Sequence, residues 1–258
     1  MLFNSYNFIF WFLPFVLIIY HFSLKLNSVS ISKYILLSAS IIFYALWKVE
    51  FVLQFIILIF INYNLSKLIL GEFSNKLDHK KDRISVLAFT VSLIINLGFL
   101  FYYKYLIFFM SQSNELFGTT FVLEKIIMPL GISFFTFIQI SYLIECFQKR
   151  VTQAPSLLDY MQFVTYFPHL IAGPIVLYKE LIPQFNDSTR HKTVFKNIAL
   201  GLFLFSIGMF KKVVIADSLD EHTAIAFDEG GIRFYRTWIS ALSFTLQLYF
   251  DFSGYMDM

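Results

Sequence analysis

The sequence has little charge and almost no cysteine, and each shortage excludes a class of protein. A single cysteine in 258 residues, Cys146, excludes an internal disulfide and a site built from several thiolates. Charged residues make up only 14% of the chain and the net charge is +3, so no basic surface indicates a nucleic-acid partner. We also find no P-loop, nucleophile elbow, dinucleotide-binding glycine pattern or His/Glu metal spacing. The templates of soluble enzymes therefore do not apply.

Apolar residues are what the sequence has in abundance. They make up 58% of the chain, and aromatic residues alone make up 20%. They come in long blocks separated by short polar clusters, which is the pattern of membrane spans and loops. A water-soluble core of ordinary size cannot hide this much apolar surface. We therefore predict an all-α, polytopic integral membrane protein with one transmembrane domain over residues 1–258.

The apolar blocks define the expected membrane spans. The first has no basic residue before Lys25, so it is a retained helix and not a signal peptide. The second and third are divided by the polar break at Lys48 to Glu50, which predicts two antiparallel helices. The predicted spans are Asn7 to Phe22, Tyr34 to Trp47, Phe51 to Leu70, Ile84 to Met110, Ile126 to Ile144, Ile198 to Ala216 and Trp238 to Phe252.

Basic residues predict the orientation of the chain. With the N-terminus outside, the outer loops receive only Lys48 and Lys125, and the basic cluster between Gly71 and Arg83 faces the cytoplasm. The segment Tyr160 to Val176 is interrupted by Pro168, His169, Gly173 and Pro174, and a further basic loop follows it. A re-entrant segment keeps that loop inside, whereas a full crossing would place it outside. We favour re-entry and keep the full crossing as the alternative.

Polar side chains near the last span are the first candidates for a site. Gln247, Asp251 and Tyr255 are four residues apart and share one helical face, with Gly254 beside them. This stripe fits the wall of a substrate channel, but it equally fits a hydrogen-bonded packing cluster or the interface end of a helix. A lone His169 between two prolines favours a structural role. Glu145 suggests an interfacial ion pair with the following Lys149 and Arg150, and a pocket role is the minority interpretation.

Five further stretches, spread along nearly the whole chain, are informative together. They are FNSYNFIFWFLP (Phe3 to Pro14), MPLGISFFTFIQISYLIE (Met128 to Glu145), YFPHLIAGPI (Tyr166 to Ile175), GMFKKVVIAD (Gly208 to Asp217) and LQLYFDFSGYMDM (Leu246 to Met258). In this order, they resemble the membrane-bound O-acyltransferase family, in the branch that acetylates alginate and other exported polysaccharides.

The resemblance implies a ring of tilted helices around a thin central region in the bacterial inner (plasma) membrane. It implies a cytoplasmic funnel that takes an acetyl-CoA or another acyl thioester as donor, with no tightly bound cofactor, and an outer opening for a polysaccharide acceptor. A family histidine would act as general base on the acceptor hydroxyl. Besides membrane lipid and the exported polysaccharide, it implies periplasmic acetyl-handling proteins as partners.

The resemblance also assigns residues. The expected substrate tunnel comprises Gln247, Asp251, Ser253, Tyr255 and Asp257, and the expected cytoplasmic funnel comprises Pro168, His169, Gly173 and Pro174. Met256 replaces the family's usual serine and Glu145 its usual aspartate. His169 matches a non-catalytic position. The family's catalytic histidine lies in a Trp-His motif after the DFSGY-like segment, beyond Met258, so we expect an N-terminal part that is inactive alone.

Two other functions stay open at the level of sequence. A related enzyme could move D-alanine from a carrier protein onto teichoic acid, although the LIAGPI and DFSGY segments favour the polysaccharide branch. A transporter or assembly component that binds substrate in a polar cavity without chemistry would also contain broken helices and buried polar groups.

Overall fold

The computed structural model of the protein describes residues 3–25, 29–71, 79–120, 126–171, 173–187, 195–220, 223 and 234–258. Every element within these ranges is a helix, which confirms the all-α prediction for them. The elements are α-helices, together with three π-helices labelled η. In chain order they are η1 (Phe8–Phe12), α1 (Leu13–Lys25), α2 (Val29–Ala45), α3 (Val49–Leu70), α4 (His79–Leu100), η2 (Phe101–Tyr105), α5 (Leu106–Phe117), α6 (Ile132–Phe147), α7 (Leu157–Thr165), α8 (Phe167–Leu170), α9 (Tyr178–Asn186), α10 (Phe195–Met209), η4 (Phe210–Ala216) and α12 (Phe234–Asp257).

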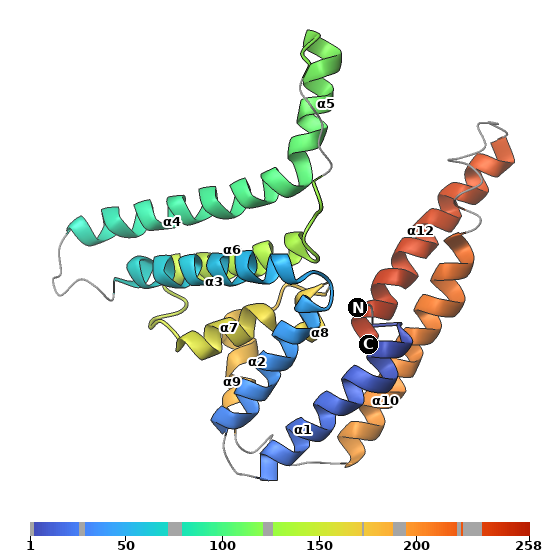
Figure 1. The fold of residues 1–258 in the computed structure, drawn as a ribbon, viewed down its shortest axis with the longest axis horizontal. Coiled ribbons are helices and arrows are strands. Elements are labelled where there is room, and N and C mark those ends of the chain that lie inside the picture. The colour runs from blue at the N-terminus through green and yellow to red at the C-terminus, as the bar shows by residue number, and fades with distance from the viewer. Residues whose placement is uncertain are drawn as a thin grey trace. The chain divides into compact units, whose positions relative to one another are not determined.

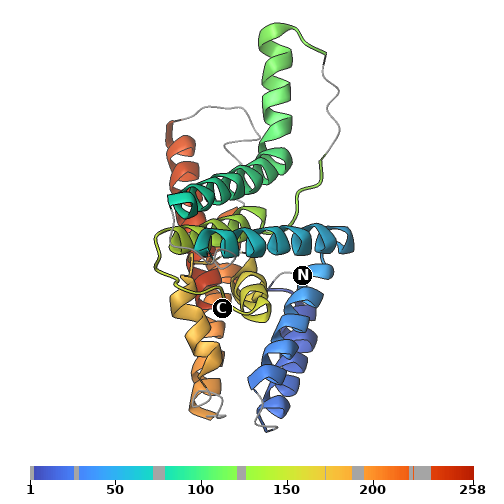
Figure 2. The same ribbon diagram turned by 90° about the vertical axis from the view of Figure 1, so that its left-hand side faces the viewer.

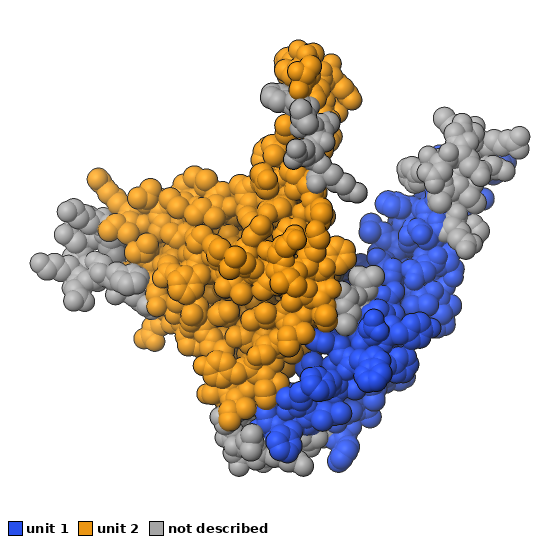
Figure 3. Space-filling model, viewed as in Figure 1, with its two compact units in different colours: residues 1–27, 172–174, 189–258 blue, residues 28–171, 175–188 orange. Residues whose placement is uncertain are grey.

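The chain divides into two compact units (Figure 3). Unit 1 contains residues 1–27, 172–174 and 189–258, and unit 2 contains residues 28–171 and 175–188. Unit 1 therefore holds the first helix and the last helices of the chain, whereas unit 2 holds α2 to α9. That residues 1–258 form a single transmembrane domain stays a prediction.

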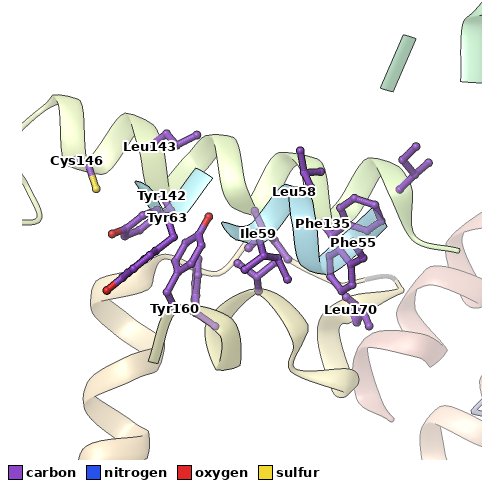
Figure 4. Packing of buried hydrophobic residues seen from close by; sticks show 14 of the residues in the cluster. Phe55, Leu58, Ile59, Tyr63, Phe135, Tyr142, Leu143, Cys146, Tyr160 and Leu170 are labelled. Carbon is purple, nitrogen blue, oxygen red and sulfur yellow. The ribbon is translucent and has the colours of Figure 1, made fainter. Parts of the chain in front are cut away.

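Three helices of unit 2 pack around a shared apolar core. α3, α4 and α6 lie side by side, and α7 packs against α3 and α6 (Figures 1 and 2). Aromatic rings dominate the core (Figure 4): the ring of Phe55 lies 4.6 Å from that of Phe135 and 4.8 Å from that of Tyr44. Large rings account for much of the buried apolar area of such a core. Part of the apolar surface of these helices is therefore buried between them.

A buried polar network joins the same four helices. Asn62 of α3 and Asn96 of α4 exchange hydrogen bonds of 3.1 and 2.7 Å between their amides. The side-chain carbonyl of Gln139 in α6 accepts from Asn62 at 2.7 Å and from the Tyr160 hydroxyl of α7 at 3.3 Å. All four residues are fully buried. Amide pairs of this kind hold helices together where lipid offers no hydrogen-bond partner.

The predicted span Ile84 to Met110 is bent. The helical run continues from Arg83 to Phe117, but η2 interrupts it, and α5 leaves α4 at a steep angle in both views (Figures 1 and 2). The run is long and apolar enough to cross a membrane, as predicted, and it bends because a π-helical turn carries an extra residue and redirects the helix axis. Of the predicted basic loop from Gly71 to Arg83, residues 72–78 lie outside the described residues, and α4 begins at His79.

Two further predictions about helix arrangement need correction. α2 and α3 are separated at Lys48, as expected, but they cross steeply instead of lying antiparallel (Figures 1 and 2), because α2 packs mainly against α7.

α6 begins at Ile132 and not near Ile126, because Gly131 adopts a left-handed conformation with φ 66°. A Cβ at Gly131 would lie 2.6 Å from the Leu170 carbonyl oxygen, so only glycine fits this contact between two of the resembling segments.

Within the part of the chain that the structure describes, three helices are long and apolar enough to cross a membrane: Val49–Leu70, Arg83–Phe117 and Phe195–Asp220. Three shorter helical runs are also apolar, namely Phe8–Leu24, Ser30–Ala45 and Ile132–Phe147. α12 has 24 residues but does not belong to either group. The interrupted segment is broken as predicted, because α7 ends at Thr165 and α8 spans only Phe167–Leu170. Whether this segment re-enters the membrane stays a prediction.

Candidate functional site

The predicted polar stripe on α12 faces two lysines of η4, within unit 1. Lys212 Nζ lies 2.7 Å from Asp251 Oδ1 and 2.9 Å from Asp217 Oδ1. Lys211 Nζ lies 2.5 Å from Asp257 Oδ2 and donates to Ser253 Oγ at 3.0 Å. Two lysines and three carboxylates therefore meet between two helices, one of which is a long apolar helix. Such groups are costly at membrane depth unless they are paired or line an interior path.

A close contact between two glycines holds these helices together. A Cβ on Gly208 would lie 2.5 Å from the Gly254 carbonyl oxygen and 2.9 Å from the backbone nitrogen of Met258. A Cβ on Gly254 would lie 2.8 Å from the Gly208 carbonyl oxygen and 3.0 Å from the backbone nitrogen of Lys212. Small residues let membrane helices approach closely. The contact places the backbone of α12 within reach of both lysine side chains.

Helical spacing explains how two consecutive lysines both reach α12. Lys211 and Lys212 lie three and four positions after Gly208, and residues at these two spacings share one helical face. Because Gly208 contacts α12, both lysine side chains flank that contact. The lysines also lie within η4, which runs from Phe210 to Ala216 with the wider π-helical hydrogen-bond pattern, and π-helical turns are rare and occur frequently at functional sites.

The remaining predicted tunnel residues occupy both ends of the same stripe. Gln247 Nε2 donates to Asp220 Oδ1 at 2.8 Å, and its side-chain carbonyl accepts from Thr223 Oγ1 at 2.9 Å. The ring of Tyr255 packs edge-on against Phe3, with 5.0 Å between centroids. The structure thus brings all five predicted tunnel residues into contact with other parts of unit 1. That they line a substrate tunnel stays a prediction.

The four predicted funnel residues fall in different units. Pro168 and His169 belong to α8 in unit 2, whereas Gly173 and Pro174 belong to unit 1. Gly173 is buried and has φ 151°, a conformation that favours glycine. Their common role in a funnel stays a prediction.

His169 is held within its own segment. Its Nε2 donates to the Phe163 carbonyl oxygen at 3.0 Å, and the side chain is buried. Ser40 Oγ accepts from the backbone N–H of Phe167 at 3.2 Å, which anchors the start of α8 to α2. These contacts fit the structural role expected for this histidine.

Glu145 does not form the ion pair that the sequence suggested. Its side chain is buried, and Oε2 accepts a hydrogen bond of 3.1 Å from the backbone N–H of Tyr178 at the start of α9. Among the described residues, Oε1 has no hydrogen-bond partner. The expectation failed because Lys149 adopts a left-handed conformation with φ 58°, and the chain turns back over the end of α6. Lys149 and Arg150 are exposed, away from the carboxylate.

Sequence reasoning missed the partners of the polar stripe on α12. These partners are Lys211, Lys212, Asp217 and Asp220, and together with the stripe they form what we call the α12 site. All four are visible in the sequence, but their distance from α12 along the chain hides the pairing. The one available signal was two adjacent lysines inside a predicted span. Within the described ranges, no group of three or more His, Cys, Asp or Glu residues is placed to hold a metal ion.

Apolar helices of membrane-spanning length, joined by amide pairs and by charged pairs between helices, define a polytopic helical membrane protein. Comparison with known sequences identifies the family. The profile of the membrane-bound O-acyltransferase family matches residues 130–258, which include α6 to α12. The chain belongs to the membrane-bound O-acyltransferase family.

Curated relatives match over the whole chain. A "Peptidoglycan O-acetyltransferase" of Helicobacter pylori is 37% identical over 285 residues, which cover 100% of this chain and 53% of the relative. A "Probable alginate O-acetylase AlgI" of Pseudomonas aeruginosa is 38% identical over 262 residues, covering 100% and 48%. A protein of the same name from Azotobacter vinelandii is 36% identical over 262 residues, covering 100% and 50%. The chain thus spans about half the length of these relatives.

Proposed function

We propose that this protein takes part in the transfer of an acetyl group from a cytoplasmic thioester donor, such as acetyl-CoA, to hydroxyl groups of an exported polysaccharide. Membership of the O-acyltransferase family supports the reaction class. The printed names of the relatives support acetyl transfer, to peptidoglycan in one case and to alginate in others. Because the chain spans about half of these relatives, the activity is proposed for the complete protein.

The α12 site supplies the observation that carries the proposal. The side chains of Asp251 and Asp217 are 49% and 46% exposed in the described structure, and that of Lys212 is 27% exposed. A half-exposed carboxylate cannot face hydrocarbon, because a charge in lipid costs about 2.5 kcal/mol or more at the helix centre. The exposed side of the cluster therefore faces water or another polar part of the protein. A polar passage for a sugar hydroxyl satisfies this requirement.

The residues of the α12 site have different expected roles. In the proposed passage, Asp251, Ser253 and Asp257 offer acceptors and donors to acceptor hydroxyls, and the two lysines hold the carboxylates in place. Residues 1–258 contain no Trp-His pair, so no residue described here is assigned as the general base. The broken segment at α7 and α8 is proposed to re-enter the membrane and to form the donor funnel, within a ring of helices whose N-terminus is outside.

The proposal is tested by expressing the complete reading frame in a bacterium without its own polysaccharide O-acetyltransferase. Membranes are supplied with acetyl-CoA carrying a labelled acetyl group, and base-labile label is measured on alginate and on peptidoglycan. Label on either polymer supports the proposal and identifies the acceptor. D-alanyl esters on teichoic acid in place of acetyl esters would instead support the rival transferase. Transport of a polymer without any ester formation would contradict both enzymatic functions.

A further inference from the structure

A cavity in unit 2 that is largely open to the molecular surface lies between the turn after α6 and the amphipathic helix α9. Its volume is about 710 Å³, within the range of small-molecule sites. Its lining combines two cations, neutral hydrogen-bonding groups and apolar surface, contributed mainly by Arg150, Thr152, Gln153, Lys179, Ile182 and Pro183. The cavity is separate from the α12 site and contains none of the predicted tunnel or funnel residues.

The wall formed by α9 is fixed at both ends by buried charges. At the start of α9, the Glu145 carboxylate accepts from the backbone N–H of Tyr178 at 3.1 Å. At the end of α9, the buried Lys33 side chain donates to Asn186 Oδ1 and also to Asp159 Oδ1 of α7. Such anchors keep the cavity wall in place before any ligand binds, which lowers the entropic cost of binding.

The opposite wall begins at a strained turn. Lys149 has φ 58°, which residues other than glycine rarely adopt. Its backbone N–H and that of Arg150 donate to carbonyl oxygens at the end of α6, at 3.0 and 2.9 Å. The turn leads directly into Arg150, which lines the cavity. Strained backbone of this kind persists where the surrounding structure enforces it and is enriched at binding sites.

The charges of the lining indicate an anionic ligand. Arg150 and Lys179 form no ion pair with any described residue, and both are exposed in the lining. Asp187 is the one acidic residue in the lining, so the lining has a net positive charge of one. Proteins commonly bind phosphate groups with the guanidinium group of arginine and the ammonium group of lysine. The apolar share of the lining favours a phosphate joined to an organic group over a free ion.

We propose that the cavity between residues 150–153 and α9 binds a phosphate ester, with Arg150 and Lys179 holding the phosphate and Ile182 and Pro183 contacting the organic part. This chemistry is offered by a soluble nucleotide-type compound and by the headgroup of an anionic phospholipid. The inference does not rest on acetyl transfer. Loss of phosphate-ester binding and loss of transfer are therefore separate outcomes.

The test uses the complete purified chain and two pairs of probes. In the first arm, coenzyme A is titrated calorimetrically and compared with pantetheine, which lacks its phosphates. In the second arm, retention of phosphatidylglycerol is compared with that of diacylglycerol by native mass spectrometry. Coenzyme A binding that the cavity variants weaken assigns the cavity to a soluble ligand, and phosphatidylglycerol retention that they weaken assigns it to a lipid. Weakening of both supports the shared phosphate chemistry. Coenzyme A binding that the variants leave unchanged belongs to the proposed donor funnel and contradicts the assignment of the cavity to a soluble ligand.

Three variants determine whether the cavity is responsible. The exchange of both cations, Arg150→Gln with Lys179→Gln, is expected to weaken binding by about tenfold or more, because each charged hydrogen bond contributes on that order. Thr152→Trp keeps both cations but fills the cavity, and it should weaken binding as well. Arg83→Gln removes an exposed cation of unit 2 outside the cavity and should leave binding unchanged.

Because Arg150, Lys179 and Thr152 are exposed, these variants are expected to elute as monodisperse species, which size-exclusion chromatography checks. The proposal is overturned if the wild-type chain binds neither phosphate probe in preference to its phosphate-free counterpart. It is equally overturned if folded double and Thr152→Trp variants bind as tightly as the wild type.

Discussion

Replacing Gly208 by alanine should separate α10 and η4 from α12 and lower the thermal stability of the protein. The added Cβ would lie 2.5 Å from the Gly254 carbonyl oxygen, whereas ordinary contacts begin at 3.4 Å. The backbones must therefore move apart by up to about 0.9 Å, because the Gly254 carbonyl oxygen and the Met258 backbone nitrogen cannot rotate away from the added Cβ, although the Met258 side chain can. A movement of that size lengthens the 2.5 Å contact between Lys211 and Asp257 and the 2.7 Å contact between Lys212 and Asp251.

The matched control is Gly201→Ala, in the same helix. A Cβ at Gly201 meets no atom within 4 Å, so this substitution gains the helix propensity of alanine without a clash. Since both variants gain that propensity, the difference between them isolates the packing cost. Overpacking of a close contact typically costs about 1–3 kcal/mol. We therefore expect Gly208→Ala to be less stable than Gly201→Ala by that amount.

The assay is thermal unfolding in detergent, followed by fluorescence-detected size-exclusion chromatography. A cost of 1 kcal/mol lowers Tm by about 2–4 °C in a chain near this length, so a difference of about 2–12 °C is expected between the two variants. If Gly208→Ala melts at the same temperature as Gly201→Ala or above it, the close helix contact is not present in the folded protein. The arrangement of the lysines around α12 would then also be wrong.

Three further predictions concern single side chains. In the complete protein, Asp251→Asn should lower acetyl transfer more than membrane abundance, because it removes the charge that faces Lys212; equal losses would make Asp251 structural. Asn62→Ala should cost about 1–3 kcal/mol, because it leaves buried polar groups unpaired, and should therefore lower Tm by about 2–12 °C. The control Asn64→Ala, on the exposed face of the same helix, should change Tm little. Glu145→Leu should destabilise the start of α9 and increase its proteolysis. Glu145→Gln keeps an acceptor for the Tyr178 N–H and should stay close to wild type. If the Glu145→Leu variant and the wild type give identical digestion patterns, Glu145 does not anchor α9.

The sequence was most informative about local properties. The break at Lys48, the interruption after Thr165 and the shared face of Gln247 and Asp251 all follow from residues close together in the chain. Helix periodicity and helix-breaking residues act over a few positions, so one sequence contains enough information to locate them. The resemblance to the family was likewise carried by contiguous segments, and the match over residues 130–258 confirms it.

Properties that depend on contacts between distant segments were not predictable in this way. The partner of Asp251 is 39 positions earlier in the chain, at Lys212, and the glycine contact between the two helices brings the two together. The burial of Glu145 was missed because Lys149 and Arg150 suggested an ion pair, whereas its partner is the backbone of Tyr178. Sequence periodicity describes the faces of one helix and does not state which faces meet.

The lysines of η4 impose a condition on how the polypeptide enters the bilayer during synthesis. A lone helix carrying Lys211 and Lys212 would carry an insertion penalty of about 2.5–3.5 kcal/mol for each charge placed centrally. Asp217 of the same helix pairs with Lys212, but the partner of Lys211 and the second partner of Lys212 are made later, in α12. Biogenesis of this part of the protein should therefore be cooperative, with the earlier helix retained at the translocon until α12 emerges and the two partition into lipid as a preassembled hairpin.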